Sequence, residues 1–177
     1  MRILGIDPGT GICGFGVISV TANIKANENS LTPVNTIYRG HPKMIDCGVI
    51  STPANTPLSE RLLDIYESMH EIIKVNKPDV MSIEKLFFVQ NITTGISVAE
   101  ARGVVLLVAK QHELPVFEYN PNQIKKTLTG YGHAEKKQIQ EIVRQHLNLD
   151  FIPEPDDAAD ALAIAITHTL LMGVQKL

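Results

Sequence analysis

The first residues of the chain form an apolar segment that ends in a single carboxylate. Ile3 to Ile6 have the composition of a buried strand, Asp7 follows directly, and a Pro/Gly-rich turn occupies 8–11. A second apolar segment, 14–18, completes the pattern of a β-hairpin. A charged group at the end of a buried strand is costly unless it is paired or binds a metal ion. This feature therefore predicts a sheet with a functional carboxylate at the end of its first strand.

The rest of the chain alternates between strand and helix patterns. A third strand is expected over 44–50, and Thr56 and Pro57 are expected to begin a helix as N-cap and first-turn residue. Strands over 80–84 and 114–119 alternate with helices over about 96–112, 121–128, 134–147 and 157–172. This order predicts an α/β fold with a mixed five-stranded sheet flanked by α-helices. We expect one domain over 1–177, with a polar loop or ragged hairpin inserted at about 21–43.

The composition is that of an ordinary globular protein, with 44% hydrophobic and 20% charged residues. No apolar run is as long as a membrane span, and the N-terminus lacks the apolar region of a signal peptide. Cys13 and Cys47 lie in apolar segments without metal-ligand spacing, which is typical of a reduced, cytoplasmic protein. The net charge is −3, but residues 101–146 hold seven Lys and Arg against four Glu. Charge distribution matters more than the total for nucleic-acid binding.

Four carboxylates are distinguished by their positions. Glu84 closes the 80–84 strand as Asp7 closes the first. Asp157 and Asp160 are three residues apart, so they share one face of the last helix. Each also has a simpler interpretation: Asp7 as an Asx-turn residue, Glu84 as an ion-pair partner of Lys85, and Asp157 as an N-cap or first-turn acid. Asp160 is harder to explain in this way, because it lies among alanines that face an apolar packing surface.

Together these four carboxylates fit one chemistry. Two Mg²⁺ ions need several hard oxygen ligands, with coordination sites left for phosphate and water. Asp7 is the natural bridging ligand at the centre. Zinc is not expected, because no Cys/His cluster has suitable spacing. The neighbouring Asp156 is predicted to be a solvated turn acid without a part in the site.

Three segments of the chain resemble the RuvC family of Holliday-junction resolvases. Residues 3–17, with Ile-Leu-Gly-Ile-Asp-Pro-Gly-Thr-Gly, resemble the opening of the family. Residues 130–136, ending in Ala-Glu-Lys, resemble its basic segment, and residues 157–168 match its last catalytic helix nearly residue for residue. Shorter matches at 83–84, 101–103 and 114–119 extend the resemblance over almost the whole chain, in order.

The resemblance implies a ribonuclease-H-like fold and a homodimer that resolves four-way DNA junctions by symmetric paired nicks, in recombination and DNA repair. It implies two-metal-ion hydrolysis with two Mg²⁺ per active site, for which Mn²⁺ would substitute. The RuvA and RuvB branch-migration proteins are partners implied by the family alone. The catalytic and metal-binding roles of the family carry over to Asp7, Glu84, Asp157 and Asp160, and its DNA contacts to Phe87, Lys125 and Lys136.

The DNA-contact residues have simpler interpretations as well. Lys125 and Lys136 could be solvated helix charges, and Phe87 a core residue at the end of a strand. Arg102 is not expected to contact DNA, and His168 is expected to pack or cap within its helix.

Three other functions compete with junction resolution. The 5–10 segment also resembles the phosphate loop of actin-like ATPases and sugar kinases, but 177 residues leave no room for their second lobe. A ribosomal-RNA-processing nuclease of the YqgF type shares the fold, although the Ala-Glu-Lys segment and the last helix favour RuvC. A junction-binding protein without catalysis is the non-enzyme alternative, and the presence of all four acids argues against it.

Overall fold

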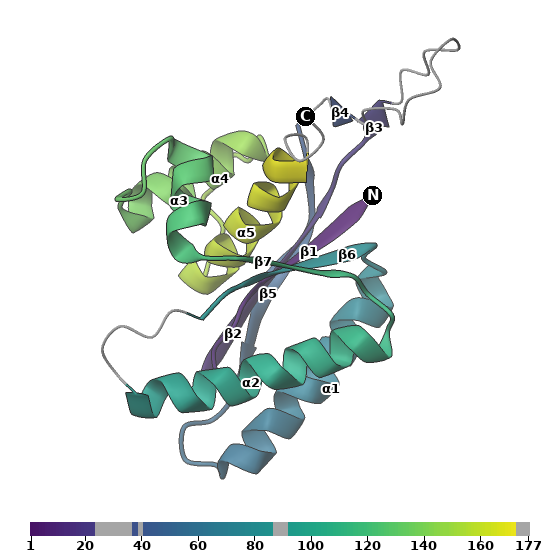
Figure 1. The fold of residues 1–177 in the computed structure, drawn as a ribbon, viewed down its shortest axis with the longest axis vertical. Helices are drawn as coiled ribbons and strands as arrows, with labels where there is room; N and C mark the ends of the chain where they lie inside the picture. Colours follow the sequence, from purple (N-terminus) through teal and green to yellow (C-terminus); the bar gives the residue numbers. More distant parts are fainter. Residues whose placement is uncertain (24–36, 39–40, 87–91, 173–177) are drawn as a thin grey trace.

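The computed structural model describes residues 1–23, 37–38, 41–86 and 92–172. Its centre is a five-stranded sheet with the strand order β5-β2-β1-β6-β7 (Figure 1). β1 is antiparallel to β2 and parallel to β6, so the sheet is mixed, as predicted. The strands of this sheet are β1 (Arg2–Asp7), β2 (Ile12–Ser19), β5 (Lys43–Ser51), β6 (Val80–Glu84) and β7 (Val116–Tyr119).

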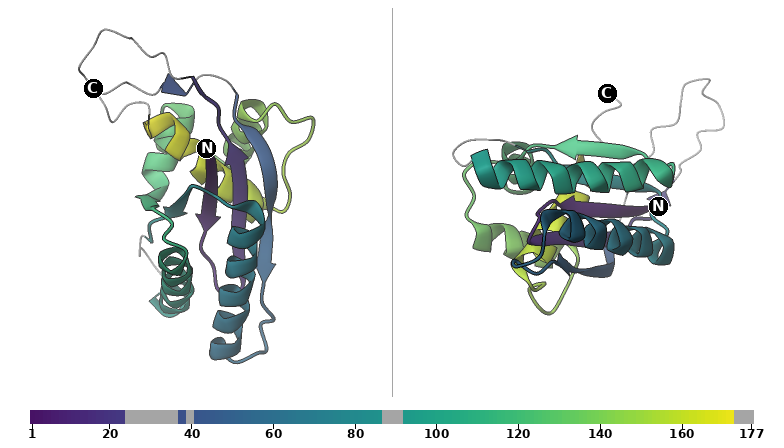
Figure 2. Two further views of the ribbon diagram at one scale, coloured as in Figure 1. Left: turned by 90° about the vertical axis from the view of Figure 1, so that its right-hand side faces the viewer. Right: turned by 90° about the horizontal axis from the view of Figure 1, so that it is seen from below.

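Helices cover both faces of the sheet (Figure 2). One face carries α1 (Leu58–Asn76) and α2 (Ile92–Gln111), and the other carries α3 (Pro121–Thr129), α4 (Lys136–His146) and α5 (Asp156–Met172). Side chains of β1 alternate between the two cores, because Leu4 and Ile6 pack with α1 and α2 while Ile3 packs with α5. By the same alternation, Asp7 belongs to the face covered by α5.

Helix α5 lies directly on the backbone of β1 and β2. A Cβ at Gly5 would overlap the carbonyl oxygen of Ala161, and a Cβ at Gly14 would overlap that of Asp157. The helix is itself rich in alanine, and its residues from 158 to 168 are buried except for Asp160. Small residues on both surfaces therefore allow the close approach, and this contact determines where the acids of the last helix lie.

The helix start at Thr56 is the main difference from the expected elements. The hydroxyl of Thr56 donates a hydrogen bond to the carbonyl oxygen of Pro53 (2.7 Å), and α1 begins at Leu58 without a side-chain cap. The prediction of Thr56 as N-cap is therefore wrong, because its hydroxyl closes the turn before the helix.

The polar segment at 21–43 contains a short hairpin in the part that the structure describes. β3 (Ala22–Asn23) and β4 (Ile37–Tyr38) pair in antiparallel fashion, which agrees with the expected ragged hairpin. Among the described residues, no helix is both long enough and apolar enough to cross a membrane.

Candidate active site

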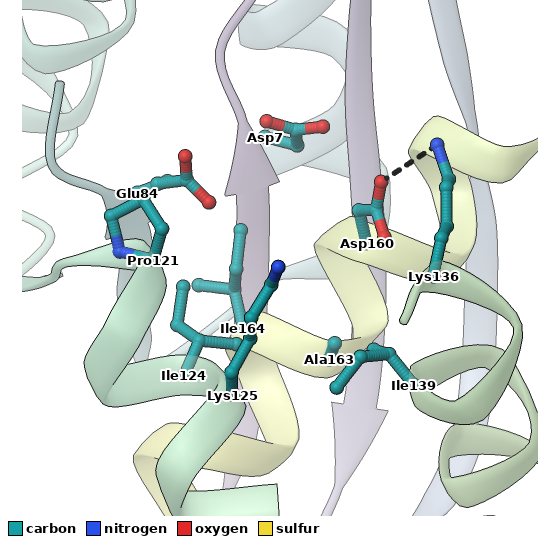
Figure 3. A pocket seen from close by; sticks show the side chains of 10 residues that line it. All are labelled: Asp7, Glu84, Pro121, Ile124, Lys125, Lys136, Ile139, Asp160, Ala163 and Ile164. Carbon is teal, nitrogen blue, oxygen red and sulfur yellow. Dashed lines mark ion pairs between the residues drawn. The ribbon is translucent and has the colours of Figure 1, made fainter. Parts of the chain in front are cut away.

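Two strand ends and the last helix bring three of the four predicted carboxylates to one place. Asp7 and Glu84 end β1 and β6, which are parallel neighbours with Ile6 opposite Ile83, so the two acids leave the sheet side by side. Asp160 faces the same space from α5 (Figure 3). These carboxylates line a pocket of about 220 Å³. Its other walls come from Pro121, Ile124, Lys125, Lys136, Ile139, Ala163 and Ile164.

Asp157 lies beside this pocket and is not part of its lining. It is half-buried in the first turn of α5, where its backbone carbonyl rests against Gly14. Its negative charge nevertheless reaches the pocket, because it raises the pKa of both Asp7 and Asp160. The structure thus brings Asp7, Glu84 and Asp160 around one space and keeps Asp157 within electrostatic reach of it.

The carboxylates hold protons more tightly than free acids do. Burial, together with the neighbouring charges of Glu84, Asp160 and Asp157, raises the pKa of Asp7 from 3.8 to about 8. Burial and the charge of Asp160 raise the pKa of Glu84 from 4.5 to about 7, although Lys125 opposes this. Burial also raises the pKa of Asp160. Such a group of desolvated, mutually repelling acids is stabilised by a proton or by a cation.

Lys136 is a positively charged side chain that lies against these carboxylates. Its Nζ atom, at the start of α4, lies 3.1 Å from a carboxylate oxygen of Asp160 and 3.4 Å from one of Asp156. Burial alone would lower the pKa of Lys136, but its hydrogen bonds and ion pairs with these two acids raise it. Lys136, predicted as a DNA contact, therefore lies on the carboxylates in this state of the protein.

Asp156 joins α5 to α4, a role that no pattern in the sequence indicated. It is the first residue of α5, and its carboxylate accepts a hydrogen bond from the Nε2 atom of Gln140 (2.7 Å) as well as the ion pair with Lys136. Asp156 is exposed to solvent, as predicted, but it begins the helix rather than a turn, and α4 gives its carboxylate two partners. Gln140 is itself buried, so this contact helps to hold α4 against the acids of α5.

Arg102 supports the position of Glu84 from behind the site. Its Nε atom donates to the backbone carbonyl oxygen of Glu84 (3.3 Å), and its Nη2 atom pairs with the carboxylate of Glu118 on β7. These contacts give Arg102 a structural role, and its absence from DNA binding stays a prediction. No spacing in the sequence identifies this support, because the three groups come from α2, β6 and β7.

Of the remaining predicted residues, Lys125 lies at the pocket and His168 in the core. Lys125 lines the pocket from α3, and its contact with DNA stays a prediction. Phe87 lies outside the described residues. His168 is fully buried and shares a hydrogen bond of 2.6 Å between its Nδ1 atom and the hydroxyl of Tyr119, so it packs in the core, as expected. Burial lowers the pKa of His168 to about 4, which makes the ring neutral near pH 7.

The donor chemistry of the pocket suits hard divalent cations. Carboxylate oxygens are the preferred ligands of Mg²⁺. The pKa of Asp7 and of Glu84 is raised because burial and neighbouring acids disfavour their charged forms, which a bound cation would favour. In the described part of the chain, however, no group of three or more His, Cys, Asp or Glu side chains is arranged to hold a metal ion as it stands. Asp160 is instead paired with Lys136.

We expect the metal-free protein to lose stability as the pH rises. Asp7 and Glu84 are protonated in the folded state up to about pH 8 and 7, whereas in the unfolded chain they ionise near 3.8 and 4.5. The folded state therefore binds more protons in this window, and the free energy of unfolding falls between about pH 4 and pH 8. Melting temperatures measured in a chelator across this range would show the decline, and Mg²⁺ added at pH 8 should reverse it. A melting temperature that rises from pH 6 to pH 8 would contradict this electrostatic description.

Comparison with known proteins places this site in a family. The sequence profile described as "Crossover junction endodeoxyribonuclease RuvC" matches residues 3–168. The chain belongs to the RuvC family. Curated members of the family are similar over nearly their whole length. The protein from Thermotoga petrophila is 48% identical over 170 residues, covering 96% of this chain and 93% of the relative. The protein from Desulfitobacterium hafniense is 50% identical over 168 residues, covering 95% and 92%.

A solved RuvC structure supports the same assignment in three dimensions. The structure described as "T. thermophilus RuvC in complex with Holliday junction substrate" superimposes with a TM-score of 0.83 at 32% sequence identity. The alignment covers 98% of this chain and 96% of that chain. The mixed five-stranded sheet flanked by helices is therefore the ribonuclease-H-like fold of RuvC proteins, as the sequence resemblance implies.

Proposed function

We propose that this chain is a structure-selective DNA endonuclease that resolves Holliday junctions by symmetric paired nicks. The observation that carries the proposal is the meeting of Asp7, Glu84 and Asp160 around one pocket in a member of the RuvC family. The Thermus thermophilus relative, 32% identical, was solved with a Holliday junction substrate, and that substrate is the one we assign here. The single domain over 1–177 would carry the whole activity.

The four acids Asp7, Glu84, Asp157 and Asp160 would hold two divalent cations, of which Mg²⁺ is the expected species and Mn²⁺ a substitute. When bound, such cations activate water for in-line attack on a phosphodiester and stabilise the leaving 3′ oxygen. Asp7 would serve both ions, because it lies between Glu84 on one side and Asp160 on the other (Figure 3). The buried position and high pKa of Asp7 support this assignment, because a cation would remove the repulsion there.

DNA would be held by the helices that border the pocket. Lys125 and Lys136 reach it from α3 and α4, where their ammonium groups can contact a phosphate next to the carboxylates. Lys136 now pairs with Asp160, and a phosphate at the pocket would compete with this carboxylate for its ammonium group. Phe87, outside the described residues, would stack against unpaired junction bases.

Assembly is the part of the proposal that rests on the family alone. A homodimer would present two pockets to the two strands that are cut, because a two-fold enzyme matches a junction of roughly two-fold symmetry. RuvA and RuvB would be the partners that deliver the junction, and the cytoplasm the setting.

The decisive experiment is cleavage of an end-labelled four-way DNA junction beside a linear duplex of the same sequence, with Mg²⁺ or with a chelator. Symmetric, Mg²⁺-dependent nicks in the junction alone are expected. Equal cutting of the linear duplex would indicate a nuclease without junction selectivity. A structured RNA in a parallel reaction tests the YqgF-like alternative, and junction binding without nicks in Mg²⁺ or Mn²⁺ would support a protein that binds but does not cut.

The Lys136→Ala variant is expected to bind the junction more weakly and with a smaller salt dependence. Each lost phosphate contact lowers the slope of log K against log salt concentration by about 0.9. Filter binding or fluorescence anisotropy over a range of salt concentrations measures that slope. Lys74→Ala, an exposed lysine in the last turn of α1 on the other face, is the matched control and should keep the parent slope. If Lys136→Ala also keeps the parent slope, Lys136 does not contact the DNA backbone.

A further inference from the structure

Two histidines far apart in the sequence meet on the surface between α1 and the end of α2. The Nδ1 atom of His70 lies 2.7 Å from the Nε2 atom of His112, which immediately follows α2. Their ring centroids are 4.8 Å apart. His112 is exposed and His70 partly so, and therefore the pair is open to solvent. Forty-two positions separate the two residues, so no motif spacing could reveal the pair in the sequence.

The neighbours of His70 orient its ring for ligand binding. The Nε2 atom of His70 lies 3.1 Å from the side-chain oxygen of Gln111, and a ring nitrogen opposite an amide oxygen carries the proton. In the neutral ring Nδ1 then carries the lone pair, and it faces the Nε2 atom of His112 at hydrogen-bond distance. Tyr66 also contacts the His70 ring edge-on, with centroids 4.5 Å apart. A hydrogen bond on the far nitrogen is the usual way in which proteins orient a metal-ligating histidine.

The pair is separate from the carboxylate pocket. α2 ends at Gln111, and β7 then runs parallel to β6 until Tyr119 lies opposite Glu84. The end of α2 therefore lies at the opposite end of the sheet from the carboxylates (Figure 1). None of the residues that line the pocket belongs to α1 or α2. The two places also differ in chemistry, since imidazole nitrogen favours zinc, nickel and copper whereas carboxylate oxygen favours magnesium.

We propose that His70 Nδ1 and His112 Nε2 form a surface site for a divalent transition-metal ion such as Zn²⁺. Metal–nitrogen distances of 2.0–2.1 Å with tetrahedral angles require the two nitrogens to be about 3.3 Å apart. The rings would therefore separate by roughly 0.6 Å from their hydrogen-bonded positions, which their exposure allows. His112 binds as the tautomer protonated at Nδ1, and water completes the coordination. The ion links the middle of α1 to the end of α2 and so stabilises that helical layer.

The experiment is a Zn²⁺ titration of the full chain in saturating Mg²⁺, read by competition with a chromophoric chelator. The parent should bind one Zn²⁺ that both His70→Gln and His112→Gln lose. Gln111→Ala keeps both ligands but removes the orienting hydrogen bond, so we expect affinity to fall about tenfold. His133→Gln removes an exposed histidine elsewhere and is the matched control, which should titrate like the parent.

Melting temperature is the second readout, because an ion that binds only the folded state raises it. Zn²⁺ should raise the melting temperature of the parent and of His133→Gln but not of His112→Gln. These are surface substitutions, and circular dichroism will verify that each variant is folded. Equal Zn²⁺ stoichiometry and affinity in the parent and in His112→Gln would overturn the proposal. So would an unchanged affinity of the His70→Gln variant.

Discussion

Asp7→Asn is expected to abolish nicking of a four-way junction, by about a thousandfold or more, while leaving junction binding nearly intact. A carboxylate that serves two cations contributes several kcal/mol to the chemical step, and about 1.4 kcal/mol corresponds to a factor of ten in rate. Asparagine keeps the shape of the side chain but removes its charge. Single-turnover cleavage and gel-shift binding, measured on the same junction, separate the two effects. Retained nicking would exclude Asp7 from the metal site.

The same substitution should make the metal-free protein more stable at pH 8. The charge that Asp7 acquires as the pH rises towards 8 lies buried beside Glu84 and Asp160, and asparagine carries no such charge. The melting temperature of Asp7→Asn in a chelator should therefore exceed that of the parent at pH 8 and approach it at pH 4 to 5. Loss of activity with a gain in stability would distinguish a catalytic role from a structural one. A variant that is less stable than the parent at pH 8 would show that Asp7 supports the fold.

Gly14→Ala is expected to destabilise the protein by several kcal/mol and to remove cleavage with it. Gly14 lies opposite Asp7 in the β1–β2 pairing, and a Cβ there would overlap the backbone carbonyl of Asp157. A backbone atom cannot rotate away as a side chain can, so α5 would have to move off the sheet and carry Asp157 and Asp160 with it. Overpacking of this kind costs about 1–3 kcal/mol, and more where backbone must shift.

Denaturant unfolding measures the loss for Gly14→Ala, and Gly132→Ala provides the control. A Cβ at Gly132 would meet no atom within 4 Å, so its unfolding midpoint should remain that of the parent. A Gly14→Ala variant with parental stability and parental cleavage would mean that the close contact between α5 and β2 is not required for the site.

The parts of the site that follow from one strand or one helix could be predicted from the sequence. Asp7 and Glu84 were identifiable because each directly follows an apolar run. Such a run predicts a buried strand and also predicts the residue at which that strand ends. The expected sheet and helices follow from the same periodicity, with ends that differ by a few residues.

The parts that depend on packing between distant segments could not be predicted in this way. Lys136 contacts Asp160 only because α4 packs on α5, and Asp156 finds Gln140 for the same reason. Asp157 and Asp160 share a helix face, yet only Asp160 lines the pocket. The backbone carbonyl of Asp157 lies against Gly14 on the sheet instead. Thr56 is a short-range example. Its hydroxyl could have capped the helix, but it donates to the carbonyl oxygen of Pro53, three residues earlier.

The position of α5 on β1 and β2 also has a consequence during synthesis. Asp7 belongs to β1, which is synthesised before α5, the helix that carries Asp157 and Asp160. Until α5 is in place, Ile3 and Ile18 lack a large part of their cover, and Asp7 cannot meet Asp160. A nascent chain without α5 therefore has no complete carboxylate pocket, and we expect it not to cut DNA.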